Sequence, residues 1–307
     1  MSSLYDVAVV GGGIAGLSAG LAGARLGRKT LVLTGEILGG QLLSIARVDG
    51  YPGFPEGVAG YDLCPMAQEQ AVACGAELAA ERVRALRRAD DGWHLFGEDG
   101  GEFVARAVVL ATGARLRELG VPGEAALRGK GVSHCASCDG PLLRGRVVAV
   151  VGGGDSAAQE ALTLAEFAAR VILVHRGPGL SAQASYREAV RAHPRIETRA
   201  GCEVSEILGQ DAVTGLRLAD ATGGVSDVDV FGVFAYTGLQ PMVDLVKNML
   251  QVGPSGGVPT DGWMRTAVAG LFAAGAVRQG WAGRAVASAG EGTTAAIAAD
   301  RYLRDLD

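Results

Sequence analysis

The chain has few cysteines and no block of basic residues. Five cysteines among 307 residues are too few for a disulfide scaffold, so we expect one redox pair in a reducing compartment, the cytoplasm. The net charge of −5 and the lack of a Lys/Arg-rich run argue against nucleic acid or an anionic membrane as the main partner. With 49% hydrophobic residues, the chain can bury a large core, and its length predicts about two soluble globular domains.

The one long uncharged run does not have the pattern of a membrane anchor. Val7–Ala24 spans eighteen residues, which is near the lower limit for a membrane span. Six of these residues are glycine, no basic residue precedes the run, and Asp6 adjoins it. This arrangement suits neither a signal peptide nor an anchor, so we expect no integral membrane segment.

Glycine, by contrast, is abundant, with 48 residues gathered in motifs that indicate tight turns at ligand sites. The first motif, GGGIAG, follows the apolar run Tyr5–Val10 and precedes an alanine-rich stretch that ends near Leu26. A strand, a GxGxxG turn and a helix in this order predict a dinucleotide site. Gly11 permits the tight turn, Gly13 lets the backbone approach a pyrophosphate at the helix N-terminus, and Gly16 lets the helix pack on the strand.

The next expected strand does not end in the acidic residue that usually binds a ribose. It finishes with Thr34, Gly35 and Glu36. The rest of this block is predicted to contain a strand at Thr30–Thr34, an irregular loop at Val48–Gly60, a helix at Tyr61–Cys74, strands within Glu77–Gly97 and at Glu102–Leu110, and the turn Ala111–Ala114. The small residues of that turn suit close approach to a ligand, although an ordinary loop would have the same composition.

The pattern of strand, glycine loop and helix occurs a second time. The apolar run Arg146–Val151 leads into GGGDSA and a helix expected to reach about Ala169. The next strand, Val171–Val174, ends in His175 and Arg176, where the ribose of a bound dinucleotide would lie. The chain therefore contains an internal duplication of a nucleotide-binding fold.

The C-terminal part is expected to complete the first of these folds. Strands are predicted at Val230–Tyr236 and Gly270–Ala276, followed by a helix from about Ser288 to Leu303. The run Ala289–Gly292, at the expected start of this helix, would point a helix N-terminus toward a flavin or phosphate, with core packing as a comparable explanation.

The predicted fold class is α/β, with two Rossmann-like three-layer nucleotide-binding domains. Small-residue crossings near Gly113 and Gly238 divide the chain. We expect a discontinuous domain of residues 1–114 and 241–307, and a second domain of residues 115–240.

Between the two glycine loops lies the segment VSHCASCDG, Val132–Gly140. Cys135 and Cys138 have the spacing of a redox-active disulfide, and positive charge or a helix end would lower the pKa of one thiol. Asp139 could pass a proton to the departing sulfur, and His134 could stabilise a thiolate. The alternative is half of a zinc site, but a structural zinc site needs a second ligand pair and the other cysteines are scattered singly. We therefore expect no metal.

The order of these motifs resembles the low-molecular-weight thioredoxin reductase family over nearly the whole chain. The shared motifs are GGGIAG, TGEILGGQL, ATGA, CASCDG, GGGDSA, HR and LFAAGAVR…AGEG. The resemblance implies that the first and last segments bind FAD, that the middle segment binds NADPH and carries the redox pair, and that Asp139 is the acid/base. It also implies a homodimer whose domains rotate to present the cysteines alternately to the flavin and to a thioredoxin-like or other disulfide protein.

The resemblance also implies two sets of cofactor-binding residues. For FAD they are Gly11, Gly13, Ile14, Ala15, Gly16, Thr34, Gly35, Gly40, Gln41, Leu42, Val83, Ala111, Thr112, Gly113, Gly275, Ala276, Arg284 and Ala285. For the second dinucleotide they are Gly152, Gly154, Asp155, Ser156 and Arg176.

The departures from the family pattern concentrate where cofactors bind. The family reads the 2′-phosphate of NADPH with HRRxxxR, whereas Gly177 and Ser181 stand at two of the three arginine positions here. Losing two charge-assisted contacts should cost roughly 3 kcal/mol or more. The other departures are Gln159 for a helix acid, Ala276 for the aspartate of AGD, Gly50 for an asparagine, and Arg284-Ala285 for Arg-Gln.

Because the phosphate loop is kept while the 2′-phosphate clamp is lost, the sequence predicts an FAD-dependent disulfide/dithiol oxidoreductase that does not use NADPH. It would resemble the diflavin-linked disulfide oxidoreductases, with NADH or a second FAD in the second site. A conventional NAD(P)H-dependent thioredoxin reductase is the alternative. A non-enzymatic relic that keeps the fold for binding or assembly is the third, and the intact CxxC-Asp argues against it.

Overall fold

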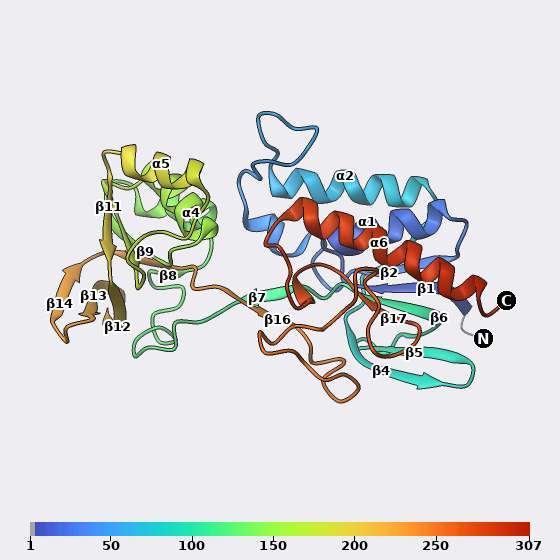
Figure 1. Cartoon of the computed structure of the whole chain (residues 1–307). Helices are drawn as coiled ribbons and strands as arrows, with labels where there is room; N and C mark the ends of the chain where they lie inside the picture. Colours follow the sequence, from blue (N-terminus) through green and yellow to red (C-terminus); the bar gives the residue numbers. More distant parts are fainter. Residues whose placement is uncertain (1–3) are drawn as a thin grey trace. The chain divides into compact units, whose positions relative to one another are not determined.

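A computed structural model describes residues 4–307, and in it the chain forms two compact units (Figure 1). The first unit combines the residues up to Arg115 with Gln240–Asp307, and the inserted unit is Leu116–Leu239. Two short strands, β7 (Ala114–Leu116) and β16 (Leu239–Pro241), pair where the chain crosses from one unit to the other. These crossings stand beside the boundaries expected from the sequence.

A parallel sheet forms the centre of the first unit. Its strands, in spatial order, are β3 (Glu77–Ala79), β2 (Thr30–Leu33), β1 (Leu4–Val10), β6 (Glu102–Leu110) and β17 (Leu271–Ala273). The first half of β6 also pairs antiparallel with β5 (Gly92–Gly97), which in turn pairs with β4 (Val83–Ala89). Consequently β6 belongs both to the parallel sheet and to a three-stranded antiparallel layer.

The two faces of this sheet are covered by different layers because successive side chains of a strand point in opposite directions. In β1, Val7 and Val9 pack with helices α1 (Ile14–Arg25) and α6 (Ala285–Arg304). The alternate residues Ala8 and Val10 pack with the antiparallel layer, around the fully buried Trp93 of β5. A further helix, α2 (Gly60–Ala73), lies next to α1. The unit is thus built of three layers.

The inserted unit repeats this plan. Its parallel sheet has the order β11 (Ile196–Ala200), β10 (Arg170–His175), β9 (Val147–Val151), β15 (Gly232–Ala235) and β8 (Val132–Ser133). Helices α4 (Asp155–Ala165) and α5 (Ala184–Ala192) pack on the face that carries Val148 and Val150. On the face that carries Ala149 and Val151 lie the antiparallel strands β12 (Cys202–Gly209), β13 (Val213–Asp220) and β14 (Val225–Asp229). The predicted fold class, two Rossmann-like three-layer units, is confirmed.

The expected helix start at Ala289–Gly292 is wrong. Helix α6 begins at Ala285, so this run lies inside the helix and presents no helix N-terminus. Gly292 instead allows close packing, since a Cβ there would lie 2.0 Å from the Ala15 carbonyl oxygen of α1. Core packing, the comparable explanation, accounts for this glycine.

Other differences concern element ends and one unpredicted layer. Helix α4 stops at Ala165, four residues before the expected end, and the strands near residues 230–236 and 270–276 shorten to β15 and β17. The antiparallel strands β12–β14 and helix α5 were not predicted. Within residues 4–307, no helix combines the length and apolar character needed to cross a bilayer.

Candidate functional site

The first glycine loop connects β1 to α1 and has the shape that its three glycines predict. Gly11 adopts φ +124°, and a Cβ there would lie 2.2 Å from the Ala111 carbonyl oxygen. A Cβ on Gly16 would lie 1.8 Å from the Gly11 carbonyl oxygen. Gly13 is the N-cap of α1, and no atom lies within 4 Å of the position of an added Cβ. The N-terminus of α1 therefore faces open space, which fits the pyrophosphate of a dinucleotide.

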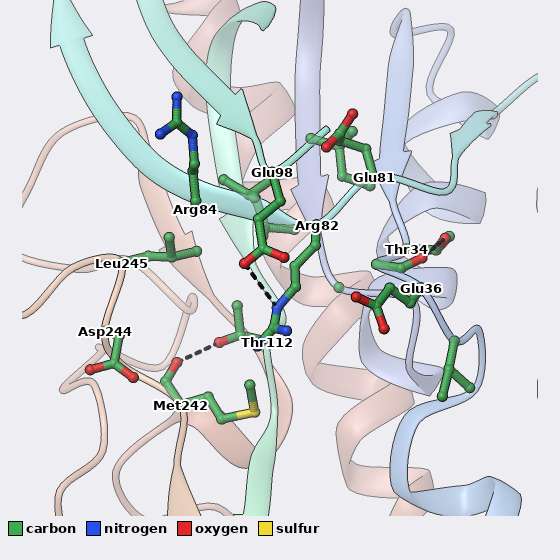
Figure 2. Close-up of a pocket in the computed structure, with 16 residues that line it drawn as sticks. Thr34, Glu36, Glu81, Arg82, Arg84, Glu98, Thr112, Met242, Asp244 and Leu245 are labelled. Carbon is green, nitrogen blue, oxygen red and sulfur yellow. Dashed lines mark hydrogen bonds and ion pairs between the residues drawn. The ribbon is translucent and has the colours of Figure 1, made fainter. Parts of the chain in front are cut away.

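A pocket of about 490 Å³ opens beside this loop (Figure 2), within the usual size range of small-molecule sites. Its lining includes five residues predicted to bind FAD: Gly11, Thr34, Gly35, Val83 and Thr112. Figure 2 also shows the Arg82–Glu98 ion pair and the hydrogen bond from the Thr112 hydroxyl to the Met242 carbonyl oxygen, 2.8 Å. The structure therefore brings together segments that are far apart in the sequence.

Glu36 is a pocket residue that the sequence reasoning did not select. The usual ribose-binding acid is absent from the end of β2, where Thr34 donates its hydroxyl to the Gly35 carbonyl oxygen at 3.0 Å. The exposed Glu36, two residues further on, lines the pocket (Figure 2). Its carboxylate can accept hydrogen bonds from ribose hydroxyls. The signal was present in the sequence, because an acid just past the strand end can reach the same ligand.

Other predicted FAD residues surround the glycine loop without lining this pocket. The short helix η1 (Gly40–Ser44) is tied to the loop by the Gly39 N–H, which donates to the Gly12 carbonyl oxygen at 2.9 Å. The side-chain amide of Gln41 donates to the Ala114 carbonyl. The remaining members of this group are Ile14 and Ala15 at the start of α1, Gly40 and Leu42 in η1, and Ala111 and Gly113 after β6.

Residues near the C-terminal end of the sequence also contact the first glycine loop and the start of α1. After β17, the short helix η3 (Gly275–Val277) places Gly275 against Ala15, since a Cβ on Gly275 would lie 2.9 Å from the Ala15 Cβ. Ala276 is in η3, whereas Arg284 and Ala285 form the start of α6 and do not line the pocket. This segment supplies backbone to the loop and no acid at the position of the family's aspartate.

An acid nevertheless occupies this region. The carboxylate of Glu291 in α6 accepts the Gly275 N–H at 2.7 Å and pairs with Arg278. The Trp281 indole N–H donates to the buried Ser288 hydroxyl at 2.8 Å. These contacts tie α6 to the residues after β17, and no sequence pattern identified them.

Cys135 and Cys138 form a disulfide, with Cα atoms 5.3 Å apart. The pair lies at helix α3 (Ala136–Asp139), for which Cys135 is the N-cap; its sulfur accepts the Cys138 N–H at 3.2 Å. Cys135 is partly buried, while Cys138 is exposed. Asp139, partly buried, directly follows Cys138 in the same helical turn. The spacing, the exposure of one sulfur and the adjacent acid suit thiol–disulfide exchange.

Three contacts hold the cysteine segment in place. The Ser133 hydroxyl accepts the Cys135 N–H at 3.0 Å, and a ring nitrogen of His134 is 3.1 Å from the Ala235 carbonyl oxygen. The Ala136 N–H donates to the buried Tyr236 hydroxyl at 3.2 Å. Sequence reasoning did not identify Tyr236. Among residues 4–307 no cluster of candidate metal ligands occurs.

The second glycine loop, between β9 and α4, repeats the geometry of the first. Gly152 adopts φ +143°, and a Cβ there would lie 2.3 Å from the Tyr236 carbonyl oxygen. Gly154 is the N-cap of α4 with open space around an added Cβ. Asp155 begins α4 and accepts the Gln183 backbone N–H at 2.6 Å, while Ser156 is exposed. The N-terminus of α4 is therefore also shaped for a pyrophosphate.

The residues after β10 differ from those after β2. His175 is 5% exposed, and burial lowers the pKa of its imidazole. Arg176 is exposed. Ser181 donates both its N–H, at 2.8 Å, and its hydroxyl, at 3.1 Å, to the Gly153 carbonyl oxygen. The loop after β10 is thus anchored to the glycine loop by a serine at one of the family's arginine positions.

Comparisons with known proteins agree with this geometry. Residues 5–292 match the family described as pyridine nucleotide-disulphide oxidoreductase. The chain is 36% identical over 307 residues to a thioredoxin reductase of Treponema pallidum (100% of this chain, 99% of the relative). It is 40% identical over 308 residues to one of Mycolicibacterium smegmatis (99% and 98%). A crystal structure of Lactococcus lactis thioredoxin reductase superposes with a TM-score of 0.95 at 34% identity and covers 98% of this chain and 99% of that one.

The likeness spans both units and both glycine loops, and the disulfide predicted from the CxxC spacing is present. It supports a flavin-dependent disulfide oxidoreductase that binds FAD. The chain belongs to the pyridine nucleotide-disulphide oxidoreductases and, among them, to the low-molecular-weight thioredoxin reductase family.

Proposed function

We propose that this protein is a thioredoxin reductase in which the Cys135–Cys138 pair carries electrons from FAD to the disulfide of a thioredoxin-like protein. The observation that carries the proposal is the disulfide at α3, with one sulfur exposed and Asp139 beside it. The relatives named thioredoxin reductase, which match along the full chain, support this choice of partner.

In the proposed mechanism, FAD bound at the first glycine loop would, in its reduced form, supply the two electrons that the disulfide takes up. Gly11, Gly13 and Gly16 shape the loop for its pyrophosphate, and Glu36 accepts hydrogen bonds from the ribose. Two electrons break the Cys135–Cys138 bond. Asp139 gives a proton to one sulfur and the other remains a thiolate.

The exposed Cys138 is the sulfur that we propose attacks the partner disulfide, because a partner can reach it. Attack forms a mixed disulfide and releases the first partner sulfur as a thiolate, which takes a proton from solvent. The Cys135 thiol returns its proton to Asp139 and displaces the second partner sulfur, which also takes a proton from solvent. These steps restore the intramolecular disulfide and leave the partner as a dithiol. A homodimer and a cytoplasmic location, both expected from the sequence, complete the proposal.

For the electron donor, we propose a nicotinamide dinucleotide bound at the second glycine loop. Gly152, Gly154, Asp155 and Ser156 form the start of α4, where a pyrophosphate would lie. Arg176, exposed after β10, is the cation available to the adenosine end. The family description and the names of the relatives favour this donor over an NADPH-independent reaction.

A second candidate keeps the second site but excludes NADPH. It is favoured by the loop after β10, where Gly177 and Ser181 replace two arginines and Ser181 is bonded to Gly153. With Arg176 as the remaining cation of the clamp, the 2′-phosphate would lack about two charge-assisted contacts, each worth ~1.5–3 kcal/mol. NADH or a second FAD would then occupy the site.

One experiment separates these candidates. The purified protein is assayed for flavin per chain, then mixed anaerobically with NADPH or NADH while flavin absorbance is followed, and finally given thioredoxin. One flavin per chain with rapid bleaching by NADPH and reduction of thioredoxin supports the main proposal. Bleaching by NADH but not by NADPH, or two flavins per chain, supports the second candidate. A bleached flavin that leaves Cys135–Cys138 oxidised would contradict both.

A variant pair sharpens the choice of nucleotide. Gly177→Arg with Ser181→Arg should rebuild the clamp and improve the KM for NADPH, by about tenfold to a hundredfold for one or two new contacts. The KM for NADH should stay within about twofold, because NADH has no 2′-phosphate. Arg191→Ala, on the last turn of α5, is the matched control for a change of surface charge.

A further inference from the structure

The helix that carries the redox cysteines is held by a buried tyrosine. Helix α3 has four residues, so its first N–H groups have no partner within the helix. Ala136 is fully buried, and its N–H donates to the Tyr236 hydroxyl, whose residue is 8% exposed. An N–H buried at this depth without a partner would destabilise the helix. Tyr236 therefore fixes the position of the cysteine turn.

Tyr236 also contacts the second glycine loop and lies near two acids. Its carbonyl oxygen is the atom that a Cβ on Gly152 would strike. Burial, followed by the charges of Glu160 and Asp139, raises the pKa of the Tyr236 phenol well above its usual value. The hydroxyl consequently remains protonated at physiological pH. The first of these two acids has a carboxyl group that no step of the mechanism uses.

That carboxyl group belongs to Glu160 of α4, which is 6% exposed. It lies among the small buried residues of α4, next to Ala161 and one turn after Ala157, in the core that also contains Ala136 and Tyr236. Burial raises the pKa of Glu160 to about 7. The group therefore changes charge in the physiological pH range.

Among the residues that the structure describes, no opposite charge lowers the pKa of this acid. Helix α4 packs against α3, α5, β9, β10 and β11. The titratable groups on these elements are Asp139 on α3, Tyr186, Arg187, Glu188 and Arg191 on α5, Arg170 and His175 on β10, and Glu197 and Arg199 on β11. Arg187 donates to the Ala182 carbonyl oxygen and Arg170 pairs with Glu197, so neither is directed at Glu160. Burial is the cause of the raised pKa of Glu160.

We propose that Glu160 is a positioning residue that acts through Tyr236 and takes up a proton when the Cys135–Cys138 disulfide is reduced. Ionised Glu160 places a negative charge behind the cysteine turn and opposes the thiolate formed on reduction. Protonated Glu160 removes that opposition. The inference rests on the proposed function, because it requires Cys135–Cys138 to be the pair that is reduced.

Two electrons from the flavin break the sulfur–sulfur bond, one sulfur takes a proton from Asp139, and the other stays a thiolate. The new negative charge raises the proton affinity of Glu160, which takes a proton from solvent. When the thiolate attacks a partner disulfide, its charge passes to the departing partner sulfur and Glu160 releases its proton to solvent. Asp139 regains its proton from the second thiol when the intramolecular disulfide re-forms.

The first test compares Glu160→Gln with the parent in dithiothreitol redox buffers from pH 6 to pH 8.5. Mass spectrometry of the alkylated peptide that contains Cys135 and Cys138 gives the equilibrium constant for reduction. The ratio of variant to parent constants should be near one at pH 6, where Glu160 is protonated. At pH 8.5 it should be on the order of five, because the disulfide of the parent, with Glu160 ionised, is harder to reduce. Glu166→Gln, the same charge change at the exposed C-cap of α4, should leave the ratio at one.

Two outcomes would overturn the inference. One is a ratio of one at every pH, and the other is a ratio that differs from one but does not change with pH, which is the mark of a structural effect. In a Tyr236→Phe background, the effect of Glu160→Gln should fall below about twofold, since the link to α3 is removed. An undiminished effect there would exclude Tyr236 as the intermediary.

A measurement on the parent protein covers the case in which the variants fail to fold. The infrared difference spectrum, reduced minus oxidised at pH 7, should contain a growing band of a protonated carboxyl group. Glu160→Asp should shift that band, and Asp139→Asn should leave it in place. No growing band overturns the inference. A parent protein whose cysteines dithiothreitol cannot reduce would instead count against the proposed function itself.

Discussion

The two units share a scaffold and differ at the end of the second strand. In each, a parallel sheet has helices on one face and a three-stranded antiparallel sheet on the other. Gly11 and Gly152 adopt nearly the same backbone angle, and each lies against a carbonyl of a neighbouring strand end. After β2, however, Glu36 lines an open pocket, whereas after β10 Ser181 is bonded to the glycine loop. The glycine loops of both units are shaped to bind a pyrophosphate. The residues after the second strand determine which dinucleotide each site accepts.

The helices differ at one informative position. Ala19 in α1 and Glu160 in α4 stand at the same distance from the first glycine of their loops, and both are buried. An alanine packs there without cost, while a carboxyl group must lose its hydration. The inserted unit therefore has a titratable group where the first unit has a methyl group, and it is also the unit that carries the cysteines.

The largest effect is expected from Cys138→Ser, which should abolish the thiol chemistry of the inserted unit and leave flavin binding by the first unit unchanged. Cys138→Ser should reduce thioredoxin reduction to background, because the sulfur that a partner can reach is lost. Bound flavin should remain at the parent level, since the FAD residues lie in the first unit. The assay measures flavin per chain and thioredoxin turnover together. Cys74→Ser, an exposed thiol at the end of α2, is the control, and turnover near the parent rate in Cys138→Ser would exclude the assignment.

The next prediction tests whether the two loops hold different ligands. Gly13→Ala and Gly154→Ala place a methyl group in open space on extended backbone, so both proteins should fold normally. Gly13→Ala should weaken FAD binding by roughly tenfold or more, the equivalent of ~1.4 kcal/mol. Gly154→Ala should keep its flavin and raise the KM for the nicotinamide nucleotide. Loss of flavin from both variants would break the distinction between the loops.

The third prediction concerns Glu160→Gln, which removes the buried titratable group that the first unit lacks. The pKa of Glu160 is raised in the folded protein from 4.5 to about 7, so the folded state binds more protons than the unfolded state between these values. The parent should therefore lose stability as pH rises through this window, and Glu160→Gln should not. The free energy of unfolding in urea, measured for Glu160→Gln relative to the parent, should rise by about 3 kcal/mol from pH 4 to pH 8. Equal pH dependence in both proteins would contradict the burial of this acid.

The smallest expected effect concerns a segment of the first unit that has no counterpart in the inserted one. Trp281→Phe removes the indole N–H that donates to Ser288 and leaves a buried hydroxyl without that partner. The free energy of unfolding should fall by about 1–2 kcal/mol. Alanine in place of the exposed Val286, in the first turn of α6, is the control and should change stability by less than about 0.5 kcal/mol.

The sequence predicted the parts of the molecule that local patterns specify. Runs such as Val147–Val151, followed by three glycines, combine a buried strand with a turn that few other residues allow, so both βαβ beginnings were recognisable. The CxxC spacing was likewise enough to predict the disulfide. These features depend on neighbours in the sequence, and the structure agrees with them.

The remaining features depend on contacts between distant residues. The start of α6 was misplaced because Gly290 and Gly292 resemble a helix boundary, whereas Gly292 is needed for packing against Ala15. Strands β12–β14 carry many exposed charged side chains, so their apolar alternation was weak. Tyr236 and Glu160 are far apart in the sequence, and their proximity to the cysteines becomes visible only in the folded chain.

The pairing of β17 with β6, and of α6 with α1, has a consequence for biosynthesis. A ribosome makes the N-terminal strands of the first unit early, yet the last parallel strand, Leu271–Ala273, and the helix that covers the sheet emerge only after the whole inserted unit. The inserted unit is one continuous segment and can fold while synthesis continues. The nascent chain therefore exposes an unfinished sheet edge while the inserted unit is being made.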